Sequence, residues 1–384
     1  MKVVVAPDKF KGSLSASQAA EAIARGILAA DPKAQVDRVP MADGGEGTVE
    51  ALVAATHGRF LEARVTGPLG SPVQARYGLL GDGRTAVIEM AAASGLALVP
   101  PGRRDPSRTT TRGTGELLLA AIAAGAKRII VGIGGSATND GGAGLAEALG
   151  FQLLDRDGKP LEPGGGSLGE LQRIDASGCD LRLDTVDISV ACDVDNPLCG
   201  PRGASTVYGP QKGATPEMVA ALDDKLDHFS RIVARDVGKS IRDLPGAGAA
   251  GGLGGGLVAF AGSRLERGTD LIIEAVRLAD RIKNADLCLT GEGALDASSA
   301  YGKTAVGVAR LATSLGCPTF ALAGTIGPGA EAVLEQGITA FFSLCQGPIT
   351  LEEALTRASG LLEQASCQVI RGFVAGRSSQ ARAI

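Results

Sequence analysis

The feature that most restricts the fold of this chain is an alternation of short apolar runs with helical patterns near both of its ends. The apolar runs, which predict buried strands, cover residues 3–6, 36–40, 285–289, 319–323 and 338–342. The helical patterns that follow them cover residues 15–30, 47–56, 303–315, 329–336 and 351–370. Short buried strands that alternate with helices are typical of a parallel sheet covered on both faces. We therefore expect a doubly wound, flavodoxin-like α/β sheet with strand order 2-1-3-4-5.

The middle of the chain has a different pattern. Residues 59–90 contain β-rich runs broken by GPLGSP and GDGR, which predict an antiparallel meander. Further expected elements are a helix at 115–124, a strand at 187–192 and a polar helix at 216–237. A length of 384 residues suits two domains. We expect a discontinuous flavodoxin-like domain, residues 1–60 plus 265–384, split by an inserted mixed α/β domain, residues 61–264.

Composition and charge argue against several classes of protein. The formal net charge is −4 and the basic clusters are short, so nucleic acid is not an expected partner. The sequence shows neither the apolar region of a signal peptide nor a run of about 18 apolar residues, so we expect a cytoplasmic protein without a membrane partner. Seven cysteines without a CxxC pair indicate neither zinc nor disulfides. Because His57 and His228 are expected at the surface, proton transfer is left to carboxylates, lysines or water.

Charged loops follow three strands that are neighbours in this sheet order. They read PDKFKGS after the first strand, MADGGEGT after the second and TGEGALDASSAYGK after the third. Ligands bind beyond the carboxyl ends of such strands, so acids, lysines and glycines converge there, although each alone is typical of a solvated loop. This mixture suits phosphoryl transfer from a nucleotide with Mg²⁺. Neither GK[ST] sequence is a P-loop, because Ala297 and Val233 replace the leading glycine.

The stretch GIGGSATNDGG admits three interpretations. Gly132-x-Gly134-x-x-Ala137 is a loose Rossmann fingerprint, which would bind NAD. The polar turn also suits a phosphate cradle, provided that a cation separates the phosphate from Asp140. A glycine-rich turn that only caps a helix is the third interpretation.

The chain contains five motifs in order: APDKFKGSLSA, PMADGGEGT, GIGGSATNDGGAG, ACDVDNPLCGPRGAS with YGPQKGA, and LTGEGALDASSAYGK. Together they resemble the bacterial glycerate kinases of the type-1 family, and the resemblance extends over almost the whole chain. Only the pair Ala297-Ser298 is less polar than the resemblance leads us to expect. The resemblance implies two α/β domains with the active site in the cleft between them. It also implies ATP-dependent phosphorylation of glycerate, which we expect to convert (R)-glycerate to 2-phosphoglycerate. The carboxylates at the strand ends lead us to expect Mg²⁺, and we expect a monomer or homodimer.

The resemblance and the converging loops lead us to expect roles for individual residues. Catalysis is expected of Asp193 as the base, together with Lys9 and Asp8, while Asp140 and Asp195 are rival bases. The expected metal ligands are Asp43, Glu292 and Asp296. The residues expected to bind substrate or phosphate are Lys11, Asp43, Gly44, Gly45, Glu46, Arg108, Ser136, Thr138, Asn139, Asp140, Asn196 and Lys212. Each also has an ordinary interpretation as a surface charge or a turn residue.

Three alternative functions stay open at this point. A glycerate 3-kinase would yield 3-phosphoglycerate. A non-catalytic, two-lobed carboxylate-binding protein would have similar domains but would normally be exported. An NAD-dependent hydroxy-acid dehydrogenase would use the glycines of GIGGSA but would need a catalytic histidine. Glycerate-dependent release of ADP separates a kinase from the last two.

Overall fold

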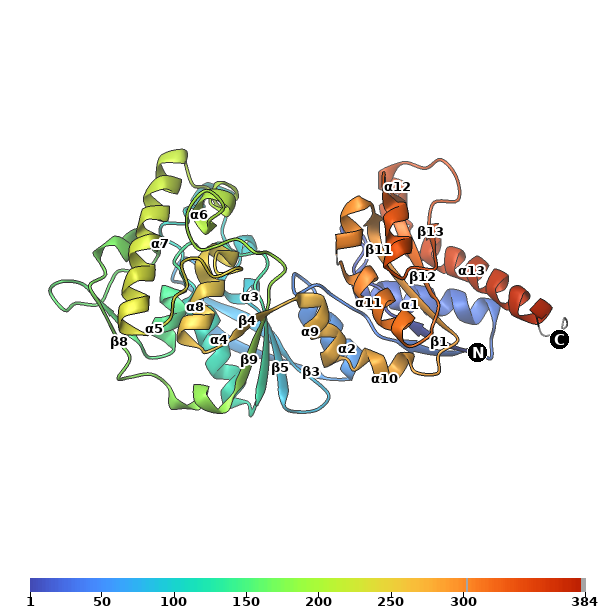
Figure 1. Ribbon diagram of the computed structural model, residues 1–384, viewed down its shortest axis with the longest axis horizontal. Helices are drawn as coiled ribbons and strands as arrows, with labels where there is room; N and C mark the ends of the chain where they lie inside the picture. Colours follow the sequence, from blue (N-terminus) through green and yellow to red (C-terminus); the bar gives the residue numbers. More distant parts are fainter. Residues whose placement is uncertain (302, 381–384) are drawn as a thin grey trace. The chain divides into compact units, whose positions relative to one another are not determined.

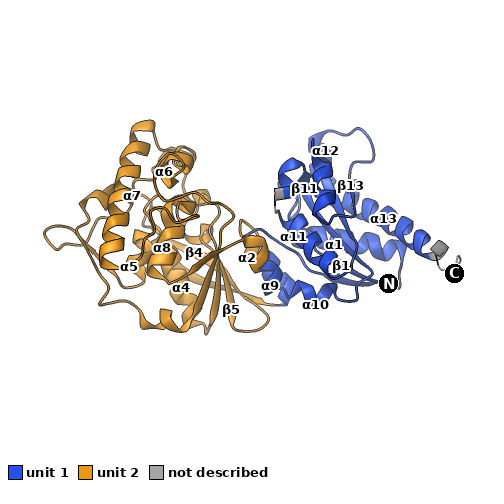
Figure 2. Cartoon of the chain, in the orientation of Figure 1, with its two compact units in different colours: residues 1–43, 50–57, 272–384 blue, residues 44–49, 58–271 orange. Residues whose placement is uncertain are grey.

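The computed structural model describes residues 1–301 and 303–380 (Figure 1). Residue 302, which falls in the predicted charged loop after the third strand, and residues 381–384 lie outside the described residues. The chain divides into two compact units (Figure 2). Unit 1 comprises Met1–Asp43, Glu50–His57 and Ile272–Ile384, and unit 2 comprises Gly44–Val49 and Gly58–Leu271. Both ends of the chain thus belong to unit 1, and unit 2 comes from the middle.

The sheet of unit 1 is parallel throughout its described strands. These strands are β1 (Lys2–Val5), β2 (Gln35–Arg38), β11 (Leu287–Leu295), β12 (Thr319–Ile326) and β13 (Ala340–Ser343). Their spatial order is β13-β12-β11-β1-β2. Numbered along unit 1, this is the expected order 2-1-3-4-5. The order reverses beside β1, so the carboxyl ends of β1 and β11 meet at the edge where such folds bind ligands.

Helices cover both faces of this sheet, because the side chains of each strand alternate between the faces. On β12, Leu322 belongs to a core with α1 (Ala16–Ala30) and α13 (Ala358–Gln380). Its neighbours Ala321 and Ala323 instead pack with residues of α11 (Thr304–Ser314) on the other face. This two-sided burial explains the apolar runs of β1 and β12, whereas the edge strands β2 and β13 are only partly buried.

Two helical expectations in unit 1 need correction. The segment expected as a helix at 329–336 is a 3-10 helix, Ala330–Gln336, because left-handed Gly329 (φ 74°) and Gly337 (φ 102°) limit its length. The single helix expected at 351–370 is two helices, α12 (Leu351–Thr356) and α13. Thr350 begins α12 through a capping box with Glu353, and α12 ends at Arg357.

The larger sheet in unit 2 is mixed. Its strands are β3 (Arg59–Thr66), β4 (Pro72–Leu79), β5 (Thr85–Glu89), β6 (Arg128–Gly132), β9 (Asp187–Ala191) and β10 (Arg264–Glu266). Strands β3, β4 and β5 form the expected antiparallel meander, whereas β5, β6, β9 and β10 pair in parallel. The carboxyl ends of these four parallel strands therefore lie at one edge of the sheet.

The longer helices of unit 2 enclose a large apolar core. They are α4 (Arg112–Ala123), α7 (Pro216–Asp236) and α8 (Leu253–Phe260). The rings of Phe151, Phe229 and Phe260 meet in this core. The glycine-rich run 246–256 leads into α8, as expected for a close-packed turn before a buried helix.

The remaining described elements are short. The helices are α2 (Thr48–Thr56), α3 (Ala91–Ser94), α5 (Ala143–Ala148), α6 (Ala204–Tyr208), α9 (Gly268–Ala275) and α10 (Leu278–Ile282). Strands β7 (Gln152–Leu154) and β8 (Arg173–Asp175) form a separate antiparallel pair. In the part of the chain that the structure describes, no helix has the length and apolar character needed to cross a bilayer.

Candidate active site

Charged side chains gather at the carboxyl edge of the unit 1 sheet. Asp8 and Lys9 follow β1, Asp43 follows β2, Glu292 and Asp296 lie at the end of β11, and Lys303 precedes α11. We call these six residues the strand-end cluster. Because β1, β2 and β11 are parallel neighbours, their ends bring together loops that are distant in the sequence. The three charged loops expected to converge do so.

Asp8 is a buried carboxylate in this cluster. Its Oδ2 accepts a hydrogen bond of 2.6 Å from the hydroxyl of Thr304, and its Oδ1 accepts one of 2.6 Å from the backbone N–H of Lys9. Burial raises the pKa of Asp8, and these hydrogen bonds oppose that shift. Thr304 was not among the expected site residues. Its position as the first residue of α11, directly after Lys303, is the signal that could have indicated it.

Glu292 is the second buried carboxylate. Its side chain is 14% exposed, and its Oε2 lies 3.9 Å from Nζ of Lys303, which also lies 3.8 Å from Oδ1 of Asp296. Its Oε1 is buried and has no hydrogen-bond partner among the described residues. Burial raises the pKa of Glu292 to about 7, although Lys303 acts in the opposite direction. A carboxylate oxygen without a partner is suited to bind a cation or a donor group of a ligand.

The three expected metal ligands do not form a ready-made metal site. Among the described residues, no group of three or more His, Cys, Asp or Glu side chains is placed to hold an ion. Asp43 instead forms an ion pair of 3.6 Å with Lys9, and Lys303 lies between Glu292 and Asp296. Asp43, Glu292 and Asp296, which were expected to hold Mg²⁺ directly or through water, each lie beside a lysine in this structure.

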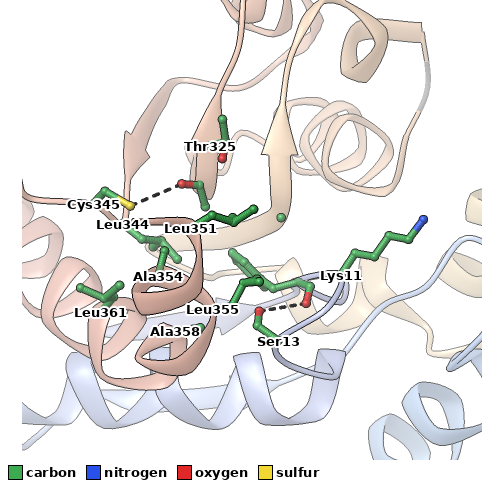
Figure 3. Close-up of a pocket in the computed structure, with 13 residues that line it drawn as sticks. Lys11, Ser13, Thr325, Leu344, Cys345, Leu351, Ala354, Leu355, Ala358 and Leu361 are labelled. Atoms are coloured by element: carbon green, nitrogen blue, oxygen red, sulfur yellow. Dashed lines mark hydrogen bonds between the residues drawn. The ribbon is translucent and has the colours of Figure 1, made fainter. Parts of the chain in front are cut away.

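A mostly apolar pocket adjoins the loop after β1 (Figure 3). Lys11 and Gly293 line it, and they are close in sequence to Lys9 and Glu292 of the strand-end cluster. Lys11, expected to contact substrate or phosphate, is exposed. The pocket was not anticipated from the sequence, since residues from β11, β12, α12 and α13 line it together.

The loop Gly44–Gly45–Glu46 packs against the carboxyl ends of strands in unit 2. A Cβ atom at Gly44 (φ 89°) would lie 2.4 Å from Cβ of Ala191, at the end of β9. A Cβ atom at Gly132, the last residue of β6, would lie 2.4 Å from the carbonyl oxygen of Gly44. Glycine is therefore needed at both positions for this close approach. Glu46 is exposed beside them.

Asp193, the expected base, is exposed just beyond β9. It accepts a hydrogen bond of 3.0 Å from the backbone N–H of Gly268. Its neighbour Asp195 pairs with Arg202 at 2.6 Å. The amide of Asn196 has partners on both sides, since it donates to the carbonyl oxygen of Arg202 and accepts from the hydroxyl of Tyr208. Asp193 is thus exposed, whereas the Asn196 amide supports its own loop.

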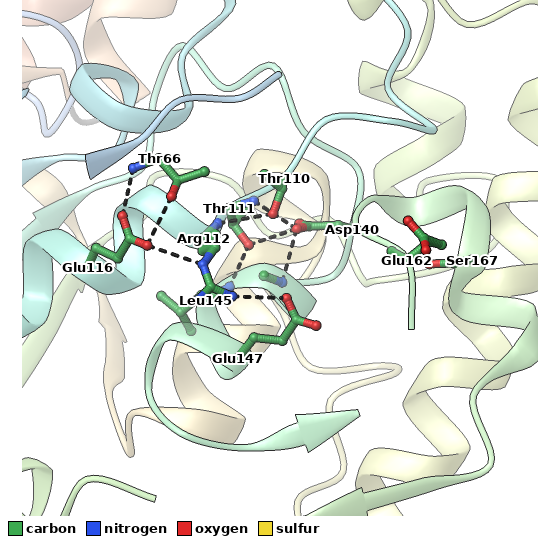
Figure 4. A network of polar contacts seen from close by, with 11 residues as sticks. Thr66, Thr110, Thr111, Arg112, Glu116, Asp140, Leu145, Glu147, Glu162 and Ser167 are labelled. Carbon is green, nitrogen blue, oxygen red and sulfur yellow. Dashed lines mark hydrogen bonds and ion pairs between the residues drawn. The ribbon is translucent and has the colours of Figure 1, made fainter. Parts of the chain in front are cut away.

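Asp140 is fully buried in unit 2 (Figure 4). It accepts hydrogen bonds of 2.8 Å from both the backbone N–H and the hydroxyl of Thr111, and further bonds from the N–H groups of Gly142 and Gly144. Burial raises the pKa of Asp140, and these donors oppose the shift. The carboxylate thereby joins the start of α5 to the start of α4, which is a structural role.

Lys212 is also buried, and its Nζ donates a hydrogen bond of 2.7 Å to the carbonyl oxygen of Thr138. Burial lowers its pKa to about 7.

Asn139 is buried as well, and its side-chain amide donates a hydrogen bond of 2.9 Å to the hydroxyl of Ser205. Thr138, Asn139, Asp140 and Lys212, which were expected to bind substrate or phosphate, are all buried in this structure. Ser136 is nearly buried, and Arg108 is exposed.

Comparison with known proteins places these features in a family. Residues 3–374 match the model of the glycerate kinase family. The chain is 54% identical over 364 residues to the glycerate kinase of Bacillus subtilis, covering 95% of each chain. It is 49% identical over 376 residues to the glycerate 2-kinase of Escherichia coli, covering 98% of this chain and 99% of that protein. A crystal structure assigned as glycerate kinase 2 of Salmonella typhimurium LT2 superimposes with a TM-score of 0.89 at 49% identity, covering 98% and 99% of the two chains.

Proposed function

Because the chain belongs to the glycerate kinase family, we propose that it transfers the γ-phosphoryl group of ATP to the 2-hydroxyl of (R)-glycerate. It is thus a phosphotransferase with an alcohol group as acceptor. The observation that supports this most directly is the strand-end cluster, which combines lysines with a buried, partly unsatisfied carboxylate. Phosphoryl transfer depends on positioning and on neutralising phosphate charge, and this cluster is suited to both tasks.

We further propose that the two compact units are two domains, one flavodoxin-like and one of mixed α/β type inserted into it. The strand order of unit 1 and the antiparallel meander of unit 2 support this division. The motif MADGGEG supplies Asp43 to the strand-end cluster and Gly44 to the strand ends of unit 2. This one motif therefore contributes residues to the candidate sites of both units.

The lysines of the strand-end cluster neutralise the phosphate oxygens in this proposal. Lys9 and Lys303 place two ammonium groups at this edge, and each could contact a phosphate oxygen in addition to its carboxylate. Lys303 also precedes the first turn of α11, where the backbone N–H groups favour negative charge. Lys11 and Arg108 are the exposed cations that we propose for the glycerate carboxylate. We exclude Lys212 from this role because it is buried.

A Mg²⁺ ion fits the oxygen chemistry of this edge. Mg²⁺ is commonly held through one or two carboxylates together with substrate phosphates, so a three-carboxylate site is not required. Glu292 is the leading candidate, since its Oε1 is buried without a partner, and Asp43 and Asp296 are secondary candidates. The ion would screen the negative charge of the transferred phosphoryl group. Loss of turnover in excess EDTA, restored by added Mg²⁺, is the expected result.

The proposed activity is tested by glycerate-dependent release of ADP, followed by identification of the product by ³¹P NMR. We expect 2-phosphoglycerate. A 3-phosphorylated product would make the chain a glycerate 3-kinase. It would overturn the proposed regiochemistry but not the proposed kinase activity. Absence of glycerate-dependent ADP release from folded protein would overturn the proposed activity.

We propose Asp193 as the carboxylate that accepts the proton of the glycerate hydroxyl. It is exposed at the end of β9, whereas the rival Asp140 is fully buried. An Asp193→Asn variant should lower kcat by roughly 10²–10⁴-fold, the usual effect of removing a general base, with a smaller effect on the KM for ATP. Asp195→Asn is the matched control, because Asp195 is exposed in the same loop and pairs only with Arg202 in the described contacts. Near-normal kcat in the Asp193 variant would assign the base elsewhere.

A further inference from the structure

The pocket beside the loop after β1 has a mostly apolar lining. Its apolar lining comes from the loop after β1, the end of β13 and the helices α12 and α13, through Phe10, Leu344, Leu351, Ala354, Leu355 and Leu361 (Figure 3). Small-molecule sites typically combine an apolar lining with a few polar groups.

At the ends of β11 and β12, the wall of the pocket includes glycines, whose peptide groups are not covered by side chains of their own. Gly293 and Gly324 line it, and a Cβ atom at Gly324 would lie 2.6 Å from the carbonyl oxygen of Gly293. Because neither residue has a side chain, a ligand can approach the peptide groups of these strand ends closely. Thr325 adds a hydroxyl to the same wall.

Two leucines at the pocket are unusually exposed. Leu351 is 72% exposed and Leu355 is 37% exposed. They lie four residues apart on α12, and therefore on the same side of that helix. Ligand-binding surfaces often have large, solvent-exposed apolar side chains around a pocket, because a bound apolar group would cover them.

Residues that line the pocket are close in sequence to residues of the strand-end cluster. Gly293 directly follows Glu292, and Lys11 is two residues after Lys9. Lys11 extends from the pocket wall, with its ammonium group away from the apolar lining (Figure 3). A ligand with an apolar ring and a polyanionic chain matches this arrangement, since the ring would occupy the pocket while the anionic chain passes Lys11.

We propose that this pocket binds the purine base of ATP. The inference rests on the proposed function, which requires a nucleoside triphosphate as the phosphoryl donor. The faces of the base contact the leucines of α12 and Leu344, and its polar edge lies against the peptide groups at Gly293 and Gly324. The triphosphate then extends along the loop after β1 toward Lys9 and Lys303.

A second, wider groove in unit 1 is the competing location. Phe320, Phe342 and Phe373 line it. Aromatic rings could stack on a base. However, Phe320 is the second residue of β12, so it lies toward the amino end of the strand and not at the edge where the charged loops gather. The experiment must therefore distinguish the two pockets.

Photolabelling of the full chain with 8-azido-ATP, with excess ATP as competitor, tests the location directly. We expect ATP-protected label on peptides that contain residues 10–13, 324–325 or 344–361, the segments that line the pocket. Protected label confined to Phe320, Phe342 or residues 365–373 would place the base in the wider groove and overturn the inference.

A pair of leucine variants provides the second measurement. Leu355→Asp should weaken the binding of ATP by about tenfold or more, while inorganic triphosphate, which has no base, should bind as in the unmodified chain. Leu28→Asp is the matched control, since Leu28 is 44% exposed on α1 of the same unit and outside the pocket. It should leave ATP binding unchanged. Equal ATP affinity in both variants would overturn the inference.

The two proposals fail in different ways. If the unmodified chain shows no glycerate-dependent release of ADP, the proposed function fails, and the purine site loses its basis. If the chain is active but Leu355→Asp binds ATP normally and the label lies elsewhere, only the pocket assignment is wrong.

Discussion

At the scale of single residues, Lys212 has an unusual environment because an amine of this kind is rarely buried. Burial lowers its pKa from 10.5 to about 7, and its Nζ donates to the carbonyl oxygen of Thr138. Between these two pH values the unfolded chain holds a proton that the folded chain lacks. The free energy of unfolding should therefore rise with pH from about 7 to about 10.5, by up to about 1.4 kcal/mol per pH unit from this group.

The difference between the unmodified chain and a Lys212→Met variant isolates this effect, because other titrating groups contribute to both. We expect the difference in the free energy of unfolding, measured by denaturant titration, to increase with pH over that interval. It should be constant at lower pH, where Lys212 is protonated in both states. A difference that stays flat, or that decreases with pH, would contradict a buried amine of lowered pKa.

At the scale of elements, the contact between α1 and α13 depends on Gly26. A Cβ atom there would lie 2.0 Å from Oγ of Ser366 and 2.2 Å from the carbonyl oxygen of Glu363. These distances are far below normal contact, so the helices must separate to admit a methyl group. Gly26→Ala should lower the free energy of unfolding by about 1–3 kcal/mol, even though alanine favours a helix more than glycine does.

A second glycine within the same helix pair provides the control for this prediction. Gly372 lies within α13, and no atom would lie within 4 Å of a Cβ atom at that position. Gly372→Ala should therefore stabilise the protein by about 0.5–1 kcal/mol through helix propensity alone. Thermal unfolding of both variants measures the contrast, and equal shifts would show that helix packing at Gly26 is not the cause.

At the scale of the whole molecule, the two compact units should unfold separately. Each has its own apolar core, and chains with more than one such core depart from two-state unfolding. We expect scanning calorimetry to show two transitions, with Gly26→Ala shifting only the transition of unit 1 and Lys212→Met only that of unit 2. One transition whose calorimetric and van't Hoff enthalpies agree would contradict independent units.

The order of elements could be predicted from the sequence because its signals are local. Every strand of unit 1 overlaps a short apolar run that a helical pattern follows, although β2 itself reads QVDR, and the structure has the strand order expected from these runs. Helix ends were less predictable. The division between α12 and α13 falls within a continuous helical pattern, and only the structure shows it, at Arg357 (φ −98°, ψ 7°).

The sequence by itself determined which loops hold the charged motifs, since strand ends, glycine turns and motif spacing are properties of neighbouring residues. Only the tertiary structure decided which polar side chains are buried. Asp8 and Asp140 both follow apolar strands, yet the first bonds to Thr304, 296 residues away, and the second joins α4 to α5. The pocket likewise requires the loop after β1 and α12 to meet. Burial and hydrogen-bond partners arise from contacts between segments that are distant in sequence, so no local pattern specifies them.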